Sequence, residues 1–126
     1  NHIITEIQKH LGDLIGTGFT HVHFDSYEAG EPTWTPKMKE EFLKRRGYDL
    51  IPYLATFAGR IIDSPEDSVK FKKDFDATIK DLYSDIYFST IAKKLKSANL
   101  NFLCEPYGGP WRQDDIMPKV KTVMTE

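Results

Sequence analysis

The pattern of apolar and polar positions at the start of the chain predicts a helix followed by a strand. Residues 3–15 place their apolar side chains at helical spacing, and the glycines at 16 and 18 supply a left-handed stop. The next run, FTHVHF at 19–24, alternates apolar and polar side chains and is rich in aromatic and branched residues. Such alternation is typical of a strand. We therefore predict that a strand ends at Phe24.

The middle of the chain is predicted to be helical. The pair Thr35-Pro36 suits the start of a helix over KMKEEFLKRR at 37–46. The apolar run at 48–60 predicts a short buried helix or turn. A further start signal at 64–67 opens a helical pattern that continues to Ser97. At 1.5 Å per residue this pattern would extend about 50 Å, a length that favours a kink.

A second predicted strand, LNFLC at 100–104, leads directly into the acidic and aromatic loop EPYGGPWRQDD. The remaining residues, 115–126, are too few to assign. Helices that connect strands in this order are typical of an α/β fold, in which long crossover helices join parallel strands. Because two strands cannot make a sheet covered on both faces, we expect residues 1–126 to be a single segment of a larger α/β barrel. The alternative is a unit that obtains strands from neighbouring copies.

The charge, the apolar content and the single cysteine of the chain limit the kinds of partner and site that we expect. The net charge is −2 and the sequence pI is near 6.1, with no basic block, so we expect no nucleic-acid partner. No apolar run approaches the roughly 20 residues that cross a bilayer, so we expect no membrane partner. The lone Cys104 excludes an intrachain disulfide, leaves the cellular compartment open, and is expected to be a small buried residue.

Acidic residues gather just after both predicted strands. Asp25 and Glu28, together with Glu31, follow the first strand, and Glu105 follows the second. The carboxyl ends of parallel strands meet at one edge of a sheet, so these acids can share a cleft. Four aromatic side chains beside the acids offer flat surfaces for sugar rings: Tyr27, Trp34, Tyr107 and Trp111.

Three uses of these carboxylates are open. A pair that flanks a glycosidic bond can act as general acid and general base. A group of acids can instead bind calcium, which prefers oxygen ligands. The third use is structural, as helix caps or as ion-pair partners of Arg45, Arg46 and Arg112.

The pair His21 and His23 forms an HxH motif that can contribute to a zinc site. No third ligand at matching spacing is evident, so we favour a structural role on the strand or contact with substrate, with His23 as the contact residue. A metal hydrolase that uses the HxH motif with Asp25 is a weaker hypothesis. The pair Gly108-Gly109 lacks the spacing of a phosphate loop and predicts a tight turn.

The chain resembles the catalytic region of glycoside hydrolase family 106, the α-L-rhamnosidases. The resemblance covers about residues 19–111, and DSYEAGEPTWT, RRGYD and EPYGG are its distinctive motifs. It implies a (β/α)8 barrel and calcium-assisted hydrolysis of α-L-rhamnosidic linkages in polysaccharides, with inversion. It also implies that Glu28 is the general acid and that Asp25 and Glu105 are calcium or sugar ligands. The general base is then expected on a later strand, with Glu105 as the fallback.

Members of this family are several times longer than 126 residues. We therefore expect the segment to be an internal part of the barrel, inactive by itself, that contributes residues to the activity of a longer protein. Its open strand edges predict that the isolated segment associates with copies of itself. The alternative function is a noncatalytic carbohydrate-binding or assembly module.

Overall fold

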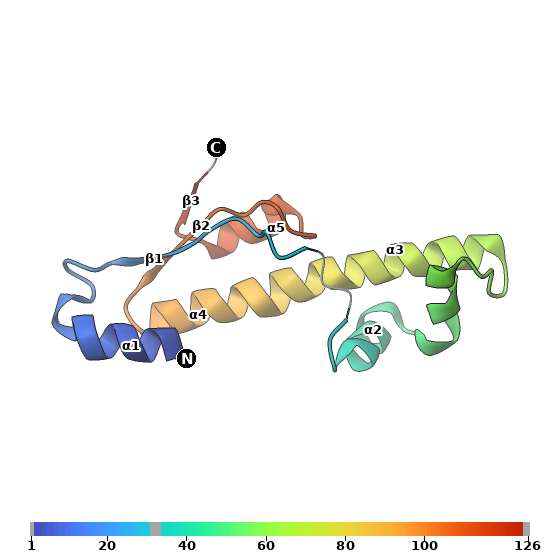
Figure 1. The fold of residues 1–126 in the computed structure, drawn as a ribbon, viewed down its shortest axis with the longest axis horizontal. Helices are drawn as coiled ribbons and strands as arrows, with labels where there is room; N and C mark the ends of the chain where they lie inside the picture. The colour runs from blue at the N-terminus through green and yellow to red at the C-terminus, as the bar shows by residue number, and fades with distance from the viewer. Residues whose placement is uncertain (1, 31–33, 125–126) are drawn as a thin grey trace. The chain divides into compact units, whose positions relative to one another are not determined.

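The computed structural model describes residues 2–30 and 34–124, which divide into two compact units. The first, here called the sheet unit, comprises residues 1–30 and 83–126; the second, the helical unit, comprises residues 31–82. Figure 1 identifies the elements of both. In chain order the sheet unit contains α1 (His2–Leu11), a 3-10 turn (Gly12–Leu14), β1 (His21–Phe24), a π-helical segment (Tyr83–Phe88), α4 (Ser89–Ser97), β2 (Asn101–Cys104), α5 (Gln113–Ile116), a second 3-10 turn (Met117–Lys119) and β3 (Thr122–Val123).

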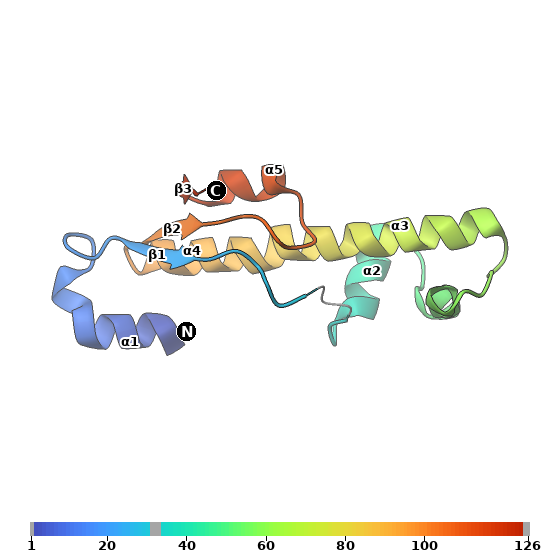
Figure 2. The ribbon, with the colours of Figure 1, turned by 45° about the horizontal axis from the view of Figure 1, so that its top comes forward.

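Within the described residues the strands form one parallel sheet in the order β1-β2-β3. β1 pairs with β2 in parallel from His21↔Asn101 to Phe24↔Cys104. Figure 2 shows both arrows pointing the same way, so the loops that follow them leave the sheet at the same end. The parallel pairing of the two predicted strands is thereby confirmed. β3, which the sequence pattern does not reveal, pairs with β2 through Leu103↔Thr122 and Cys104↔Val123.

The core of the sheet unit forms where α4 and its neighbours cover the strands (Figure 1). Its buried members are Phe88, Leu95, Leu100, Phe102, Cys104, Trp111 and Ile116. β1 contributes Val22 and Phe24, which are partly buried, whereas His21 and His23 are exposed. The predicted alternation of this strand is therefore confirmed. Phe24 meets Phe102 edge to face, with ring centroids 5.1 Å apart.

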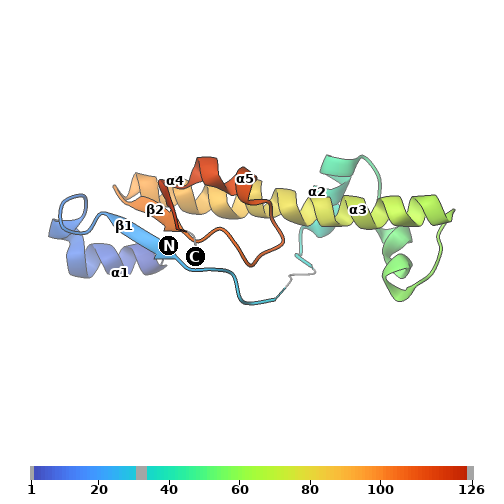
Figure 3. The same cartoon turned by 90° about the horizontal axis from the view of Figure 1, so that it is seen from above.

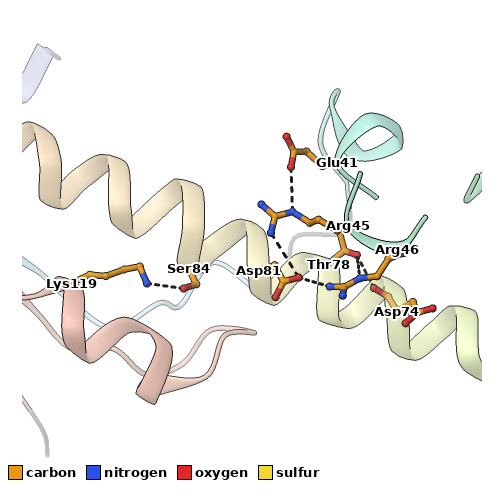
Figure 4. A network of polar contacts seen from close by, with 8 residues as sticks. All are labelled: Glu41, Arg45, Arg46, Asp74, Thr78, Asp81, Ser84 and Lys119. Carbon is orange, nitrogen blue, oxygen red and sulfur yellow. Dashed lines mark hydrogen bonds and ion pairs between the residues drawn. The ribbon is translucent and has the colours of Figure 1, made fainter. Parts of the chain in front are cut away.

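A lysine ties the segment before β3 to the π-helical segment. The Lys119 ammonium donates to the Ser84 hydroxyl oxygen at 3.0 Å and to the Asp115 carbonyl at 2.8 Å. The Lys119–Ser84 contact is drawn in Figure 4. An ammonium donates several hydrogen bonds, so one side chain can hold two elements together.

The helical unit packs α2 (Met38–Arg46) against α3 (Pro65–Leu82), with a 3-10 segment (Ile51–Ala58) between them in sequence. Figure 3 shows α2 lying across α3. Gly47 ends α2 in the left-handed conformation, with φ of 84°, as a C-terminal glycine does. Several aromatic rings pack around the fully buried Phe71: Phe42, Tyr53, Phe57 and Phe75.

Arginine side chains of α2 bind the polar side of α3 (Figure 4). Arg46 donates to the buried Thr78 hydroxyl oxygen at 2.9 Å and to Asp81. Arg45 lies 3.2 Å from Glu41 on its own helix and 3.8 Å from Asp81. These two arginines therefore have carboxylate partners within the helical unit.

Three local predictions for the helical unit have different outcomes. The start signal at Ser64 is confirmed, because its hydroxyl oxygen accepts the Asp67 N–H at 3.0 Å and its hydroxyl donates to the Asp67 carboxylate at 2.6 Å. The predicted cap at Thr35 is wrong, since α2 begins at Met38 without a side-chain cap. The short helix predicted within 48–60 is present, but its burial is only partial: Leu50 and Thr56 are fully buried, whereas Ile51 and Phe57 are 45% and 51% exposed.

The predicted helical pattern from 65 to 97 is helical throughout the described chain, but not as one α-helix. α3 ends at Leu82, and the π-helical residues 83–88 follow before α4 begins at Ser89. Such π-segments interrupt α-helices and widen the turn locally. Across residues 2–30 and 34–124, no helix combines the length and the apolar content needed to cross a membrane.

Candidate functional site

The loops after β1 and β2 bring the predicted acids together within the sheet unit. Asp25 follows the last residue of β1, and Glu105 follows the last residue of β2. The Glu105 N–H donates to the Phe24 carbonyl at 3.0 Å, which continues the strand pairing by one residue. The backbone thus carries both carboxylates to the same end of the sheet.

A pocket of about 220 Å³ opens at this end. Asp25, Glu28 and Glu105 all line it, as the sequence predicts. Its remaining lining residues are Phe24, Ser26, Tyr27, Ala29, Tyr87, Phe88, Cys104 and Trp111. The pocket therefore has an acidic part beside an aromatic part, and the strand-end acids share one hollow.

Glu105 is held by contacts at both carboxylate oxygens. Its Oε1 lies 3.5 Å from Nε2 of His23, and its Oε2 accepts a 2.6 Å hydrogen bond from the Tyr107 hydroxyl. The Glu105 side chain is 12% exposed, whereas that of His23 is 40% exposed. Glu105 is thus a largely buried carboxylate with neighbours that fix its direction.

Asp25 lies beside Glu105 and is exposed. The Ser26 N–H donates to its Oδ1 at 2.9 Å. This hydrogen bond, then one with Glu105, and the nearby His23 hold the pKa of the Asp25 carboxyl below its ordinary value, and desolvation opposes them. Hydrogen bonds to the charged form favour ionisation, so Asp25 is a carboxylate at neutral pH.

Glu28 lies on the same loop, three residues after Asp25. Its Oε1 accepts a hydrogen bond from the Ser26 hydroxyl at 3.2 Å. Ser26 therefore contacts both acids of the loop, through its N–H and through its hydroxyl. Sequence analysis did not single out this serine; its position between two acids, in the motif DSYE, is the signal that could have done so.

The possible metal-ligand atoms of His23, Asp25 and Glu105 lie close to one another. One ligand atom from each residue lies within 4.8 Å of the others. Calcium takes 6–8 oxygen ligands, and the two carboxylates suit it, while the imidazole nitrogen does not. Asp25 and Glu105 are thus two oxygen donors that lie close together at the strand ends. His21 instead contacts the Thr20 hydroxyl, with Nδ1 and Oγ1 2.7 Å apart.

The four predicted aromatic residues occupy different settings. Tyr27 and Trp111 line the pocket, with ring centroids 5.4 Å apart, edge to face. Trp111 is only 9% exposed and its indole N–H donates to the Pro106 carbonyl, so it presents little ring surface to a ligand. Tyr107 is half-buried beside Glu105. Trp34 belongs to the helical unit and is 51% exposed, and Glu31 lies outside the described residues.

A glycine allows the two strand-end loops to touch. Gly108 has φ of 83°, and a Cβ at this position would lie 2.4 Å from the Tyr27 carbonyl oxygen. Glycine alone adopts this conformation without a steric cost and also leaves room for the neighbouring backbone. The predicted tight turn is therefore present, and what it brings close is the other loop.

Cys104 is 2% exposed, which confirms the sequence expectation. Burial, and then the charge of Glu105, raise the pKa of its thiol to about 11. A thiol is a poor nucleophile when it is not ionised. Cys104 therefore belongs to the core and not to the chemistry of the pocket.

Grouped carboxylates and aromatic rings at the strand ends of a parallel sheet are compatible with glycoside hydrolysis. The family model described as alpha-L-rhamnosidase, glycoside hydrolase family 106, matches residues 1–124. The chain therefore belongs to this family.

Two individual proteins support the assignment. The chain is 37% identical over 123 residues to a protein of Formosa agariphila named "Putative beta-glucuronidase", and the match covers 98% of this chain and 11% of that protein. The solved structure of a rhamnosidase from Novosphingobium sp. PP1Y is similar with a TM-score of 0.85 and 27% identity, over 94% of this chain and 12% of that one. The chain thus spans about a tenth of the length of each relative.

Proposed function

We propose that this chain is part of a longer glycoside hydrolase that cleaves α-L-rhamnosidic linkages in polysaccharides. The observation that carries the proposal is the gathering of Asp25, Glu28 and Glu105 around one pocket at the strand ends. Family membership supports rhamnose as the sugar. The relative named as a beta-glucuronidase also bears the name of a glycosidase, although for another sugar.

Glu28 is the proposed general acid. It lies exposed on the loop after β1, where it can reach the oxygen of a glycosidic bond, and the Ser26 hydroxyl orients its carboxyl group. A general acid protonates the leaving-group oxygen as the bond breaks. Inversion also requires a base, which activates a water on the opposite side of the sugar. We place the base on a later strand, beyond residues 1–126, with Glu105 as the alternative.

Asp25 and Glu105 are the proposed ligands of a calcium ion. Both are oxygen donors, and the pKa of the Asp25 carboxyl lies below its ordinary value, so this group is ionised at neutral pH. A bound cation would supply a template that orients the sugar hydroxyls. In this arrangement His23 contacts Glu105 from the side and contributes to the direction of its carboxylate.

The small sheet is proposed to be part of a (β/α)8 barrel. Its parallel strands carry the acids at their carboxyl ends, which is where barrel enzymes place their active sites. A complete cleft positions the substrate as well as the catalytic groups, and positioning supplies much of the rate. We therefore expect the activity to require the whole protein.

Substitution of the proposed acid in the whole protein tests the function. Glu28→Gln keeps the shape of the side chain but removes its proton donor, so hydrolysis of a rhamnoside with a poor leaving group should fall at least about a hundredfold. The matched control is Glu40→Gln, which changes an exposed glutamate of α2. Near-normal hydrolysis by Glu28→Gln would remove Glu28 from the acid role.

A binding measurement beside the hydrolysis assay distinguishes the proposed hydrolase from the alternative, a noncatalytic carbohydrate-binding module. If the unmodified protein binds rhamnosides in titration calorimetry but releases no sugar from any of them, the segment belongs to a carbohydrate-binding module instead. Release of glucuronic acid, with no release of rhamnose, would transfer the proposal to the sugar named for the Formosa agariphila relative.

A further inference from the structure

Tyr107 makes contacts through its hydroxyl and its backbone at the proposed site. Its hydroxyl donates to Oε2 of Glu105 at 2.6 Å. Its carbonyl accepts the N–H of Tyr27 at 3.1 Å. The residue is half-buried, and it makes one of these contacts through its side chain and the other through its main chain. Tyr107 is thus connected both to the acid after β2 and to the loop after β1.

The hydrogen bond from the Tyr107 hydroxyl restricts rotation of the Glu105 carboxyl group about the last bond of its side chain. Glu105 has Nε2 of His23 near its Oε1 and the Tyr107 hydroxyl at its Oε2. A carboxylate with a partner at each oxygen cannot rotate about its last bond without losing one of them. The Tyr107 hydroxyl and the His23 imidazole therefore favour one orientation of the Glu105 carboxyl group.

The hydrogen bond between the Tyr27 N–H and the Tyr107 carbonyl restrains the backbone that carries the phenol ring. Because the Tyr107 carbonyl is hydrogen bonded to Tyr27, the backbone from which the phenol extends is fixed relative to the neighbouring loop. Gly108 permits this close approach, since its own lack of a side chain leaves the Tyr27 carbonyl uncrowded. The Tyr107 hydroxyl therefore contacts Glu105 from a backbone that is itself hydrogen bonded to the neighbouring loop.

We propose that Tyr107 is a positioning residue, which acts through its hydroxyl on Glu105 and not through its ring as a surface for sugar. The proposal rests on the function proposed above, in which Glu105 binds calcium or sugar. It replaces the role that the sequence suggests for this tyrosine, since aromatic residues beside acids are ordinarily expected to stack on sugars. A rotated Glu105 would still be present but would no longer face the substrate.

The test compares loss of the hydroxyl with loss of the ring in the whole protein. Tyr107→Phe removes only the hydroxyl, and kcat for rhamnoside hydrolysis should fall roughly ten- to a hundredfold, the usual effect of losing a partner that orients a functional ligand. KM should change less than about threefold, because the ring remains and the lost interaction matters most in the transition state. Tyr107→Leu should lower kcat about as much as Tyr107→Phe.

A control and a double substitution make the result specific. Tyr48→Phe removes a comparable hydrogen bond, 2.9 Å from a tyrosine hydroxyl to Asp74 in the helical unit, and should leave kcat and KM unchanged. In a Glu105→Gln background, Tyr107→Phe should cause less than about a threefold further loss, since residues that act as a unit are not additive. The double substitution is informative even if Tyr107→Phe loosens the loop, because loosening would lower activity in both backgrounds.

Two results would overturn the inference while leaving the proposed function in place. Unchanged kcat in Tyr107→Phe together with a raised KM in Tyr107→Leu would show that the ring is a sugar surface. Equal losses from Tyr107→Phe with and without Glu105→Gln would show that the hydroxyl does not act through Glu105. Absence of rhamnoside hydrolysis by the unmodified protein would instead overturn the proposed function, and the positioning role with it.

Discussion

The main-chain N–H of Tyr27 donates a hydrogen bond of 3.1 Å to the carbonyl of Tyr107. The contact joins two loops that lie some eighty positions apart in sequence (107 − 27 = 80). Each loop follows a strand of the same parallel pair and carries an acid of the pocket. The relative placement of these acids therefore depends on backbone contacts as well as on the side chains.

Gly108→Ala should disturb this connection. The left-handed conformation costs about 1 to 2 kcal/mol for a residue with a Cβ, and here the Cβ would also meet the Tyr27 carbonyl at 2.4 Å. We expect lower activity in the whole protein, and faster hydrogen exchange at the Tyr27 amide. Gly30→Ala is the control, since Gly30 shares a positive φ of 76° but has open space around it. Equal exchange rates in the two variants would argue against the clash.

Two buried threonines of the helical unit should respond oppositely to replacement by valine. Among the buried side-chain oxygens and nitrogens of the described residues, the Thr56 hydroxyl oxygen has no hydrogen-bond partner. Thr78, equally buried, accepts from Arg46 and donates to the Asp74 carbonyl. Thr56→Val should stabilise the unit by about 1 kcal/mol, and Thr78→Val should destabilise it by about 1 to 3 kcal/mol.

Hydrogen exchange of the α2 and α3 amides in the whole protein measures both threonine effects, because it reports the free energy of local opening. Destabilisation by Thr56→Val would indicate that the hydroxyl has a partner after all.

Phe71→Ala should have the largest effect on the helical unit. The ring is fully buried and packs against four other aromatic rings, so its removal leaves a cavity. We expect a loss of about 3 to 5 kcal/mol. Limited proteolysis should then cut between residues 34 and 82 under conditions that leave the unmodified protein intact. Val69→Ala, which changes a side chain of the same helix that is 52% exposed, should leave the cleavage pattern unchanged.

The Cys104 thiol should be almost unreactive in the folded protein. Its pKa is raised to about 11 from 9.0, so little thiolate exists near pH 8, and burial blocks access. The folded state holds this proton more tightly than the unfolded state, so the associated stability is present below pH 9 and is lost as the pH rises toward 11. Alkylation followed by mass spectrometry should show labelling of Cys104 only after denaturation.

Calcium removal should lower the activity of the whole protein if Asp25 and Glu105 bind the ion. Asp25→Asn should shift the calcium concentration needed for half-maximal activity upward by about tenfold or more, because a charged ligand is lost. Asp13→Asn, which changes an exposed acid of the same unit, should leave that concentration unchanged. Activity that is insensitive to chelators in the unmodified protein would contradict the metal role.

The order of β1, the helices that follow it and β2 is predictable because composition and alternation mark both of these strands. β1 and β2 combine aromatic and branched residues with clear ends, and the acids directly after them share the direction of the chain. The grouping of Asp25, Glu28 and Glu105 at one pocket follows from parallel pairing alone. Their individual contacts do not follow, because Ser26 and Tyr107 are oriented by rotamers and loop geometry that no spacing rule fixes.

Other features lacked a sequence signal for physical reasons. β3 has only two residues, too few for an alternation, and it exists because β2 offers a free edge. The π-helical residues 83–88 have an apolar content like that of their neighbours, so periodicity continues through them. Apolar content also suggested burial for 48–60, yet Ile51 and Phe57 are half exposed, since composition does not tell which face a neighbouring segment covers.

Cys104 and Glu105 are adjacent, yet one side chain is sealed in the apolar core and the other bonds to Tyr107 beside the pocket. Successive residues of an extended chain face opposite ways. Insertion or deletion of one residue in β2 should consequently be poorly tolerated, since either change would shift the strand by one residue and exchange the positions of the carboxylate and an inward apolar group. In a library of length variants, this strand should be among the least permissive stretches of the gene.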